Sequence, residues 1–511
     1  MGEEITNNRL IAKNATMLYI RMFFTMAISF YTSRIVLQAL GVSDYGIYNV
    51  VGGVTAFVSF FTASLNGATS RFLTYALGKN DVENLKLTFS TAAWVHICMA
   101  GFFVLLAETI GLWFVNTQLI IPEDRMVAAN WVYQASVVSV LTSITQTPYS
   151  ASITSHERMS AFAYIAIISA LLKLGIAVVV LIYDEDHLIL YSILLLLLSI
   201  CFRIYYRYYC VKHFEECHIT TGFDRALFKE MLLFSGWNFL GTTMLTFKHQ
   251  GLNILMNRFF GTLLNAASGI ALQVQGLLYA FTSNISSAFN PQIIKSYAAS
   301  NYGRVNELIG LGTKFTALVT CLTTIPFIFN MDYLLGLWLG EFPQSATFIC
   351  QALLFANIFN SFNSFIGTAI LATGKIKYKN IIMSCIYLLF LFGAYFLMKF
   401  AHSYIGAYIC DVLTIPIATL VCMVLLKKVM PAFSARMFLK KTYFPMILVF
   451  VASMTIAALI SSNISSPWLS LIVIFLVCDS FVLISTYFFV LDQYARDLIK
   501  KYVKSFFKKK G

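Results

Sequence analysis

Fourteen apolar stretches, each about long enough to cross a bilayer, occupy nearly the whole of this 511-residue chain. A membrane-spanning helix needs roughly 20 predominantly apolar residues. The composition agrees, because 59% of the residues are hydrophobic and the mean hydropathy is +0.76. A single soluble core cannot bury so large a share of hydrophobic residues. The chain is therefore predicted to be an integral membrane protein. The expected spans lie near 14–40, 47–70, 87–115, 127–148, 161–182, 188–210, 231–256, 263–290, 312–336, 346–372, 379–400, 404–426, 443–462 and 468–491.

The spans are expected to be helices. Phe, Leu, Ile and Val dominate them, and they lack the alternation of polar and apolar residues that marks the strands of an outer-membrane barrel. We therefore predict an all-α membrane protein with fourteen transmembrane helices.

The content of Lys and Arg alternates between high and low in successive loops. One set of loops carries cations such as Arg71, Lys79 and Lys427, whereas the opposite set is rich in acids such as Asp184 and Glu185. Loops rich in Lys and Arg stay in the cytoplasm. An even number of spans then places both termini in the cytoplasm, as expected for a multi-pass protein of a bacterial plasma membrane.

The net charge of +13 needs no nucleic-acid partner, because Lys and Arg beside the spans are expected to face anionic membrane lipids. The ten cysteines form no Cys-x-x-Cys pair, so neither a metal site nor another cofactor is indicated. No loop between the predicted spans is long enough for a catalytic domain. The chain is thus not expected to be an enzyme.

Two parts of the sequence resemble each other at an offset of about 220 residues. Residues 40–85 include LG–VSDYGIYNVV and SRFLTYALGKNDVENL, and residues 260–308 include FG–TLLNAASGIAL and PQIIKSYAASNYGRVNEL. Parallel repeats of six spans are a recurring transporter plan, with the substrate path between the halves. The prediction is two pseudo-symmetric six-helix lobes plus a C-terminal helix pair. The expected boundaries are 1–210 for the N-lobe, 211–230 for a cytoplasmic linker, 231–428 for the C-lobe, 443–491 for the hairpin and 492–511 for a basic cytoplasmic tail.

Polar side chains in the first span form a stripe. Ionisable groups at mid-bilayer cost roughly 2.5–3.5 kcal/mol on insertion scales, so they mark a cavity or a pathway. At the helical period, Asn14, Arg21, Thr25 and Thr32 share one face. Arg34 points elsewhere, and a role as an interfacial anchor paired with Asp44 is as well supported as a cavity role.

The seventh span is the repeat partner of the first and is also polar. Asn238, Thr242 and His249 share a face there, and Lys248 adjoins His249. Lys173 in the fifth span adds a further cation. The alternative for Lys248 and His249 is a place near the outer third of the membrane, paired with backbone or Gln. Together with Arg21, these side chains are the candidate cavity cations.

Acidic groups at membrane depth are few, namely Glu108, Asp411 and Asp479. The predicted path is therefore net cationic. An electropositive cavity in a low-dielectric slab attracts anions. Phosphate or diphosphate is the natural ligand class, because Arg offers paired donors that match its oxygens.

Four segments carry a family resemblance: LGVSDYGIYNVV, SRFLTYALGKND, GWNFLGTT and AILATGKIKYKN. They resemble the polysaccharide transporter family of the multidrug/oligosaccharidyl-lipid/polysaccharide exporter superfamily. The resemblance covers about residues 10–490 and implies an O-antigen or capsule repeat-unit flippase. Such a protein moves an undecaprenyl-diphosphate-linked oligosaccharide to the outer leaflet by alternating access through a cationic central cavity. It also implies a polysaccharide polymerase as a further partner.

Two other functions compete with the flippase. A drug or organic-cation exporter of the same superfamily would need buried carboxylates in the first lobe, and its spans 1, 2, 4, 5 and 6 offer none at mid-depth. A membrane-embedded polysaccharide polymerase or ligase would need a large external loop bearing Arg, His or acidic groups.

Overall fold

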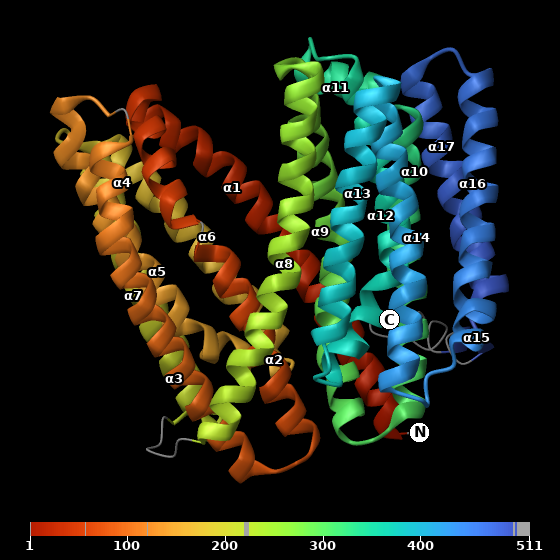
Figure 1. Cartoon of the computed structure of the whole chain (residues 1–511), viewed down its shortest axis with the longest axis horizontal. Coiled ribbons are helices and arrows are strands. Elements are labelled where there is room, and N and C mark those ends of the chain that lie inside the picture. Colours follow the sequence, from red (N-terminus) through yellow and green to blue (C-terminus); the bar gives the residue numbers. More distant parts are fainter. Residues whose placement is uncertain (1, 57, 120, 219–223, 494–495, 498–511) are drawn as a thin grey trace, which may run out of the picture. The chain divides into compact units, whose positions relative to one another are not determined.

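The computed structural model describes the chain except for residues 1, 57, 120, 219–223, 494–495 and 498–511. All regular elements of the described part are helices, which confirms the predicted all-α class (Figure 1). Most of the predicted basic tail, and part of the predicted linker, lie outside the described residues. Those two predictions stay predictions.

Eleven helices in the described residues are long and apolar enough to cross a membrane. They match eleven of the fourteen predicted spans. The other three predicted spans are helical too. They lie in the end of α1 (Gly2–Ala56) with α2 (Val58–Gly78), in α8 (Arg225–Phe260) and in α9 (Thr262–Ala298). These three are less apolar because Ser, Thr, Asn and Gly interrupt them, as in the SLNGATS and TSNISSAFN segments.

The chain forms two compact units. One, the N-terminal unit, comprises Ala12–Thr242, and the other, the C-terminal unit, comprises the described residues up to Ile11 together with those from Thr243 onward. The chain passes from one unit to the other inside α1 and again inside α8.

The N-terminal unit is arranged around α5. Its helices are the remainder of α1, then α2, and the elements that follow. They are α3 (Val82–Leu106), the π-helical turn η1 (Ala107–Gly111), α4 (Leu112–Thr117), η2 (Glu123–Arg125), α5 (Met126–Ser155), α6 (Met159–Leu181), α7 (His187–His213), η3 (Glu215–Cys217) and the first half of α8. Helix α5 packs against α2, α3 and α7. Val132 and Tyr133 of α5 are fully buried in its core together with Val51 and Leu188.

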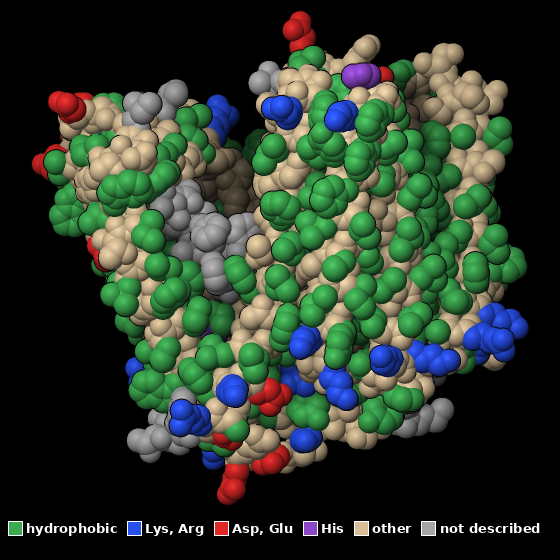
Figure 2. Space-filling model, viewed as in Figure 1, with side chains coloured by type: hydrophobic (Ala, Val, Ile, Leu, Met, Phe, Trp, Pro, Cys, Tyr) green, Lys and Arg blue, Asp and Glu red, His purple; other side chains and the backbone are tan. Residues whose placement is uncertain are grey.

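The C-terminal unit is arranged around α12. Its further elements are α9, α10 (Tyr302–Phe329), α11 (Met331–Leu339), α12 (Ser345–Ala372), α13 (Lys377–Ala401), α14 (Tyr404–Val429), α15 (Ala435–Phe438), η4 (Leu439–Tyr443), α16 (Phe444–Asn463), α17 (Pro467–Ser485) and η5 (Thr486–Val490). Helix α12 packs against α9, α10 and α14, and the α16–α17 hairpin packs against α10. Hydrophobic side chains cover the visible lengths of α13, α14 and α16, as surfaces that face lipid require (Figure 2).

The backbone repeats itself at the same offset as the sequence. Gly41 (φ 69°, ψ 173°) breaks α1, and Gly261 (φ 79°, ψ −172°) separates α8 from α9 with nearly the same geometry. Asn80 (φ 55°) and Ser300 (φ 57°) both adopt left-handed conformations in the turns before α3 and α10. This correspondence, at about 220 residues, supports the predicted pair of pseudo-symmetric lobes.

Candidate functional site

A cavity of about 1040 Å³ opens within the N-terminal unit. We call it the N-terminal cavity. Its walls come from four helices, α1, α5, α6 and α7, and its lining is mainly Ser, Thr and Tyr side chains with apolar residues between them. Ligand pockets typically measure about 300–1,000 Å³, so this one is large enough for a multi-ring polar molecule.

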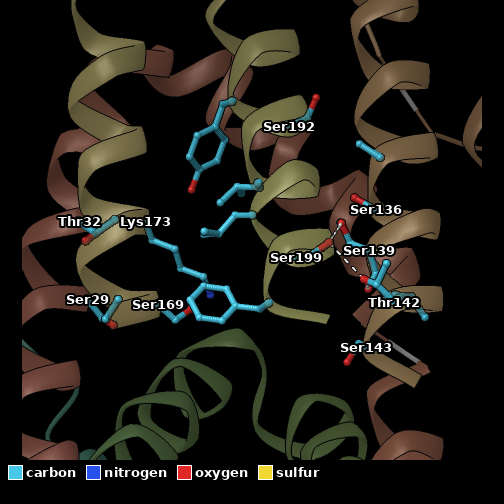
Figure 3. A pocket seen from close by; sticks show the side chains of 18 of the residues that line it. Ser29, Thr32, Ser136, Ser139, Thr142, Ser143, Ser169, Lys173, Ser192 and Ser199 are labelled. Atoms are coloured by element: carbon cyan, nitrogen blue, oxygen red, sulfur yellow. Dashed lines mark hydrogen bonds between the residues drawn. The ribbon is translucent and has the colours of Figure 1, made fainter. Parts of the chain in front are cut away.

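Hydroxyl groups line two facing walls of the N-terminal cavity. Helix α5 contributes Ser136, Ser139, Thr142 and Ser143, whose spacing of three and four residues places them on one helical face. Ser199 of α7 joins them, since its Oγ lies 3.1 Å from Thr142 Oγ1 and 3.5 Å from Ser139 Oγ. Figure 3 shows this group across the cavity from Ser29 and Thr32 of α1 and Ser169 and Lys173 of α6.

Many of these hydroxyls donate their proton to their own helix. Thr25 donates to the Arg21 carbonyl and Thr32 to the Ile28 carbonyl, both at 2.8 Å, and Ser199 donates to the Leu196 carbonyl at 2.8 Å. A hydroxyl has one proton and two lone pairs. Once its proton is used on the helix, it offers the cavity acceptors. The walls are therefore suited to ligands that donate hydrogen bonds.

Lys173 is the one Lys, Arg, Asp or Glu among the described residues that line the N-terminal cavity. Its side chain extends from α6 into the space (Figure 3), and the described residues give it no ion-pair partner. Arg21 adjoins the same space, because its guanidinium lies 5.1 Å from the ring centre of Phe162, a lining residue. The structure thus brings two of the predicted cations to one cavity, along with Thr25.

Two other predicted residues of α1 lie elsewhere. Asn14 is buried, and its Nδ2 has no hydrogen-bond partner among the described residues. Arg34 is exposed and does not line the N-terminal cavity. Asp44, its suggested partner, instead binds Arg125.

Asn238 and Thr242 of α8 make structural contacts within the N-terminal unit. The Asn238 amide donates to the Ser64 carbonyl of α2 at 3.3 Å, and Thr242 donates to the Asn238 carbonyl at 3.1 Å. Neither residue lines the N-terminal cavity.

Lys248 departs from the expectation of an unpaired cation. It forms an ion pair with Asp411 of α14, and both side chains are buried, at 7% and 6% exposure. The Lys248 ammonium also lies 4.8 Å from the ring centre of Phe390 and 5.6 Å from that of Tyr387. The sequence gives no sign that residues 248 and 411 are in contact, because α8 and α14 are far apart in the chain.

His249 is half-buried beside this pair and interacts electrostatically with both of its members. The pair therefore balances its own charge, and the predicted cationic character of the seventh span is reduced in the C-terminal unit.

The two units differ at corresponding positions. Helices α6 and α13 begin about 218 residues apart, which matches Ser169 with Tyr387 and Lys173 with Leu391. In the N-terminal unit these positions border open space, whereas Leu391 lies close enough to Gly251 that an added Cβ there would be 3.0 Å away. At the position that corresponds to Lys173, the C-terminal unit therefore has an aliphatic side chain packed against a neighbouring helix.

An ion cluster joins three elements of the N-terminal unit, namely α1, η2 and the start of α7. Arg125 of η2 donates to Asp44 of α1 at 3.0 Å and to Asp186 at 2.7 Å. Asp186 also caps α7 by accepting from the backbone N–H groups of Leu188 and Ile189 at 3.0 Å. Partial burial raises the pKa of Asp186, but the hydrogen bonds from Arg125 and the two backbone groups outweigh it, so its pKa lies below its ordinary value.

Sequence reasoning missed the hydroxyl wall of α5 and α7. The segment ASVVSVLTSITQT carries the signal, since Ser136, Ser139 and Ser143 recur at helical spacing. Intramembrane charges stand out in the sequence because they are rare, whereas Ser and Thr are common in membrane helices, where they also serve helix packing.

Solved structures of transporters share this fold. An outward-facing multidrug resistance MATE family transporter of the MOP superfamily has a TM-score of 0.70 at 13% identity, covering 83% of this chain and 97% of its own. A MATE in the bent conformation gives 0.69 at 14% identity, covering 83% and 98%. A MOP superfamily transporter from Pyrococcus furiosus Vc1, described as having a binding pocket of reverse polarity that suggests a different function, gives 0.68 at 14%, covering 83% and 96%.

No family model and no curated protein matches the sequence. At such low identity the structural likeness establishes the fold, which is that of membrane transporters with helices in two lobes.

Proposed function

We propose that this protein is a flippase that carries an anionic, glycan-bearing lipid, of the undecaprenyl-diphosphate-linked oligosaccharide class, across a bacterial plasma membrane by alternating access. The observation that carries the proposal is the lining of the N-terminal cavity, in which many hydroxyls surround one unpaired lysine and no described carboxylate. The transporter fold supports movement of a cargo across the bilayer rather than its chemical conversion.

The charge of the site favours an anionic cargo. A diphosphate loses its hydration on entering a bilayer, a cost that is prohibitive without compensating charge. Lys173, with Arg21 beside the cavity, supplies that charge. A membrane that is negative inside then favours outward movement, by about 2.3 kcal/mol per charge per 100 mV.

The walls favour a cargo rich in hydroxyls. Hydroxyls of Thr25, Thr32 and Ser199 present lone pairs to the space, as described above. Sugar O–H groups are suitable donors to such acceptors, and several weak bonds of this kind hold a mobile cargo without trapping it. The diphosphate cannot donate, so it is expected at Lys173 and the glycan along α5 and α7.

The test is transport by the full-length protein in vesicles loaded with a fluorescent undecaprenyl-diphosphate oligosaccharide. Lys173→Ala should slow flipping about 10- to 100-fold, because a charge-assisted hydrogen bond contributes roughly 1.5–3 kcal/mol. Lys173→Arg should retain most of the rate.

Lys212→Ala serves as the matched control, because Lys212 is exposed on α7 and does not line the cavity. Unchanged flipping by a well-folded Lys173→Ala protein, or equal losses in both alanine variants, would contradict the proposal.

An organic-cation exporter is the second candidate, and the comparisons favour it, since the neighbours include a multidrug resistance transporter. The acceptor-lined walls of the N-terminal cavity would also suit a ligand whose ammonium group donates hydrogen bonds. Lys173 opposes it by repelling cations. Ethidium efflux from cells that express the protein, together with faster efflux in Lys173→Gln, is the outcome that this candidate predicts and the flippase does not.

A further inference from the structure

A groove of about 570 Å³ lies where α16 begins, remote in sequence from the elements that line the N-terminal cavity. We call it the α16 groove. Its lining combines two cations with four apolar side chains: Arg436, Leu439, Lys440, Phe444, Pro445 and Leu448. None of these residues takes part in the proposed transport site.

The backbone aligns the groove along one face of the helix. Pro445 has no N–H, so the Lys441 carbonyl lacks its usual helical donor, and the Phe444 N–H instead bonds to the Leu439 carbonyl. The result is the π-helical turn η4, a kind of turn that frequently occurs at functional sites. Arg436, Lys440, Phe444 and Leu448 follow one another at intervals of four residues across it and form a single stripe.

The stripe changes character along its length. Arg436 and Lys440 are exposed, and no described carboxylate lies within ion-pair distance of either. Phe444 and Leu448, further into α16, are 56% and 69% exposed. Lys and Arg side chains gather at this end of α16 in Figure 2, with hydrophobic side chains beyond them. By the positive-inside rule this end faces the cytoplasm.

We propose that the α16 groove binds one anionic phospholipid of the cytoplasmic leaflet. Its phosphate lies between Arg436 and Lys440, and one acyl chain lies along Phe444 and Leu448. The two cations with no neighbouring acid favour a net negative headgroup over a zwitterionic one, whose ammonium would find no partner. The apolar half of the groove favours an intact lipid over free phosphate.

Native mass spectrometry of the full-length protein in detergent tests this, with phosphatidylglycerol and phosphatidylcholine of equal chain length as probes. The wild type should retain phosphatidylglycerol in preference. Arg436→Gln with Lys440→Gln should weaken its binding about 30-fold, since each surface cation contributes roughly 1 kcal/mol toward anionic lipid and tenfold in affinity is 1.4 kcal/mol. Equal retention of phosphatidylcholine by the wild type would overturn the proposal.

The matched control is Lys427→Gln with Lys428→Gln, which removes two exposed charges from the end of α14 outside the groove. It should leave phosphatidylglycerol binding unchanged. If both double variants lost binding equally, the overall positive charge of this end of the protein would explain the binding, and the proposed site in the α16 groove would be refuted. Soluble glycerophosphoglycerol should not compete. Displacement by equimolar undecaprenyl phosphate would also overturn the proposal, because the occupant would then be a prenyl lipid. None of these outcomes depends on flipping activity.

Discussion

The buried charges of Lys248 and Asp411 stabilise the protein only as long as both are present. Lys248 and Asp411 are both nearly inaccessible, and the aromatic rings of Tyr387 and Phe390 surround the ammonium. Removing one member leaves the other charge in a medium of low dielectric constant, which costs more than the pair contributes.

Asp411→Asn should therefore lower the free energy of unfolding by about 3–5 kcal/mol, the range for breaking a buried pair. The double change Lys248→Met with Asp411→Asn should recover most of that loss, because it removes both charges and nearly keeps both side-chain volumes. Melting temperatures of the detergent-purified variants measure this. A double variant less stable than Asp411→Asn would show that the pair does more than balance charge.

The unpaired Lys173 illustrates the opposite case. It is exposed to the N-terminal cavity and has no ion-pair partner among the described residues, so its charge remains available to a ligand. Of the predicted cations, only those whose surroundings lack an acid can act on a cargo. That distinction depends on tertiary contacts and not on residue type.

At the scale of the helices, two glycines interrupt the longest runs. Gly41 and Gly261 have positive φ with ψ near 180°, a region used almost only by glycine. An added Cβ at either position meets nothing within 4 Å, so the cost of a side chain there is conformational and not steric contact.

We expect Gly41→Ala to destabilise the protein by about 1–3 kcal/mol, the cost of holding a non-glycine residue in this region. Gly46→Ala is the control, because Gly46 is helical with equally open surroundings, and alanine should be neutral or stabilising there by up to about 1 kcal/mol. Thermal unfolding of both variants provides the comparison. Equal stabilities would mean that α1 can straighten at residue 41.

Asp186 links the start of α7 to η2 and gives the ion cluster a defined pH dependence. Its pKa is lowered in the folded protein, so the stabilisation is complete above the ordinary pKa of 3.8 and is lost as the pH falls through the folded-state value. Asp186→Asn removes the charge but keeps an oxygen that can cap α7.

The melting temperature of Asp186→Asn should lie below that of the wild type by a constant margin between about pH 7 and pH 5, and the margin should shrink below about pH 4. The effect is expected to be at most about 1 kcal/mol, because the cluster is partly exposed. A margin that widens on acidification would contradict the direction of the shift.

For the whole molecule, the alternation of loop charge makes a topological prediction. A green fluorescent protein fused after residue 511 should fluoresce, because the C-terminus is predicted to lie in the cytoplasm. Alkaline phosphatase fused after Asp184, in the opposite set of loops, should be active because it requires export. Inactive phosphatase at Asp184 alongside activity after Lys428 would invert the predicted orientation.

The overall plan could be read from local pattern. Apolar length predicts the helices, and the LG and FG motifs of the two halves correspond to the breaks at Gly41 and Gly261. Much of the candidate site could not be read this way. The partner of Lys248 is 163 residues away, and Asn238 binds Ser64 across 174 residues. Such pairings depend on how the helices pack, which hydropathy does not encode.

The direction of the hydroxyl protons in the N-terminal cavity bears on how discriminating the protein is. Rotatable hydroxyls whose protons stay on their own helices impose little stereochemistry on a guest, because they accept from any suitably placed O–H. For the glycan cargo proposed above, binding to such walls would depend on the number of hydrogen bonds that the glycan can donate, and only weakly on the configuration of the sugar that donates them. Such a carrier would tolerate the exchange of one sugar for another. Full methylation of the glycan would remove its hydrogen-bond donors and so abolish its binding to the hydroxyls of the cavity.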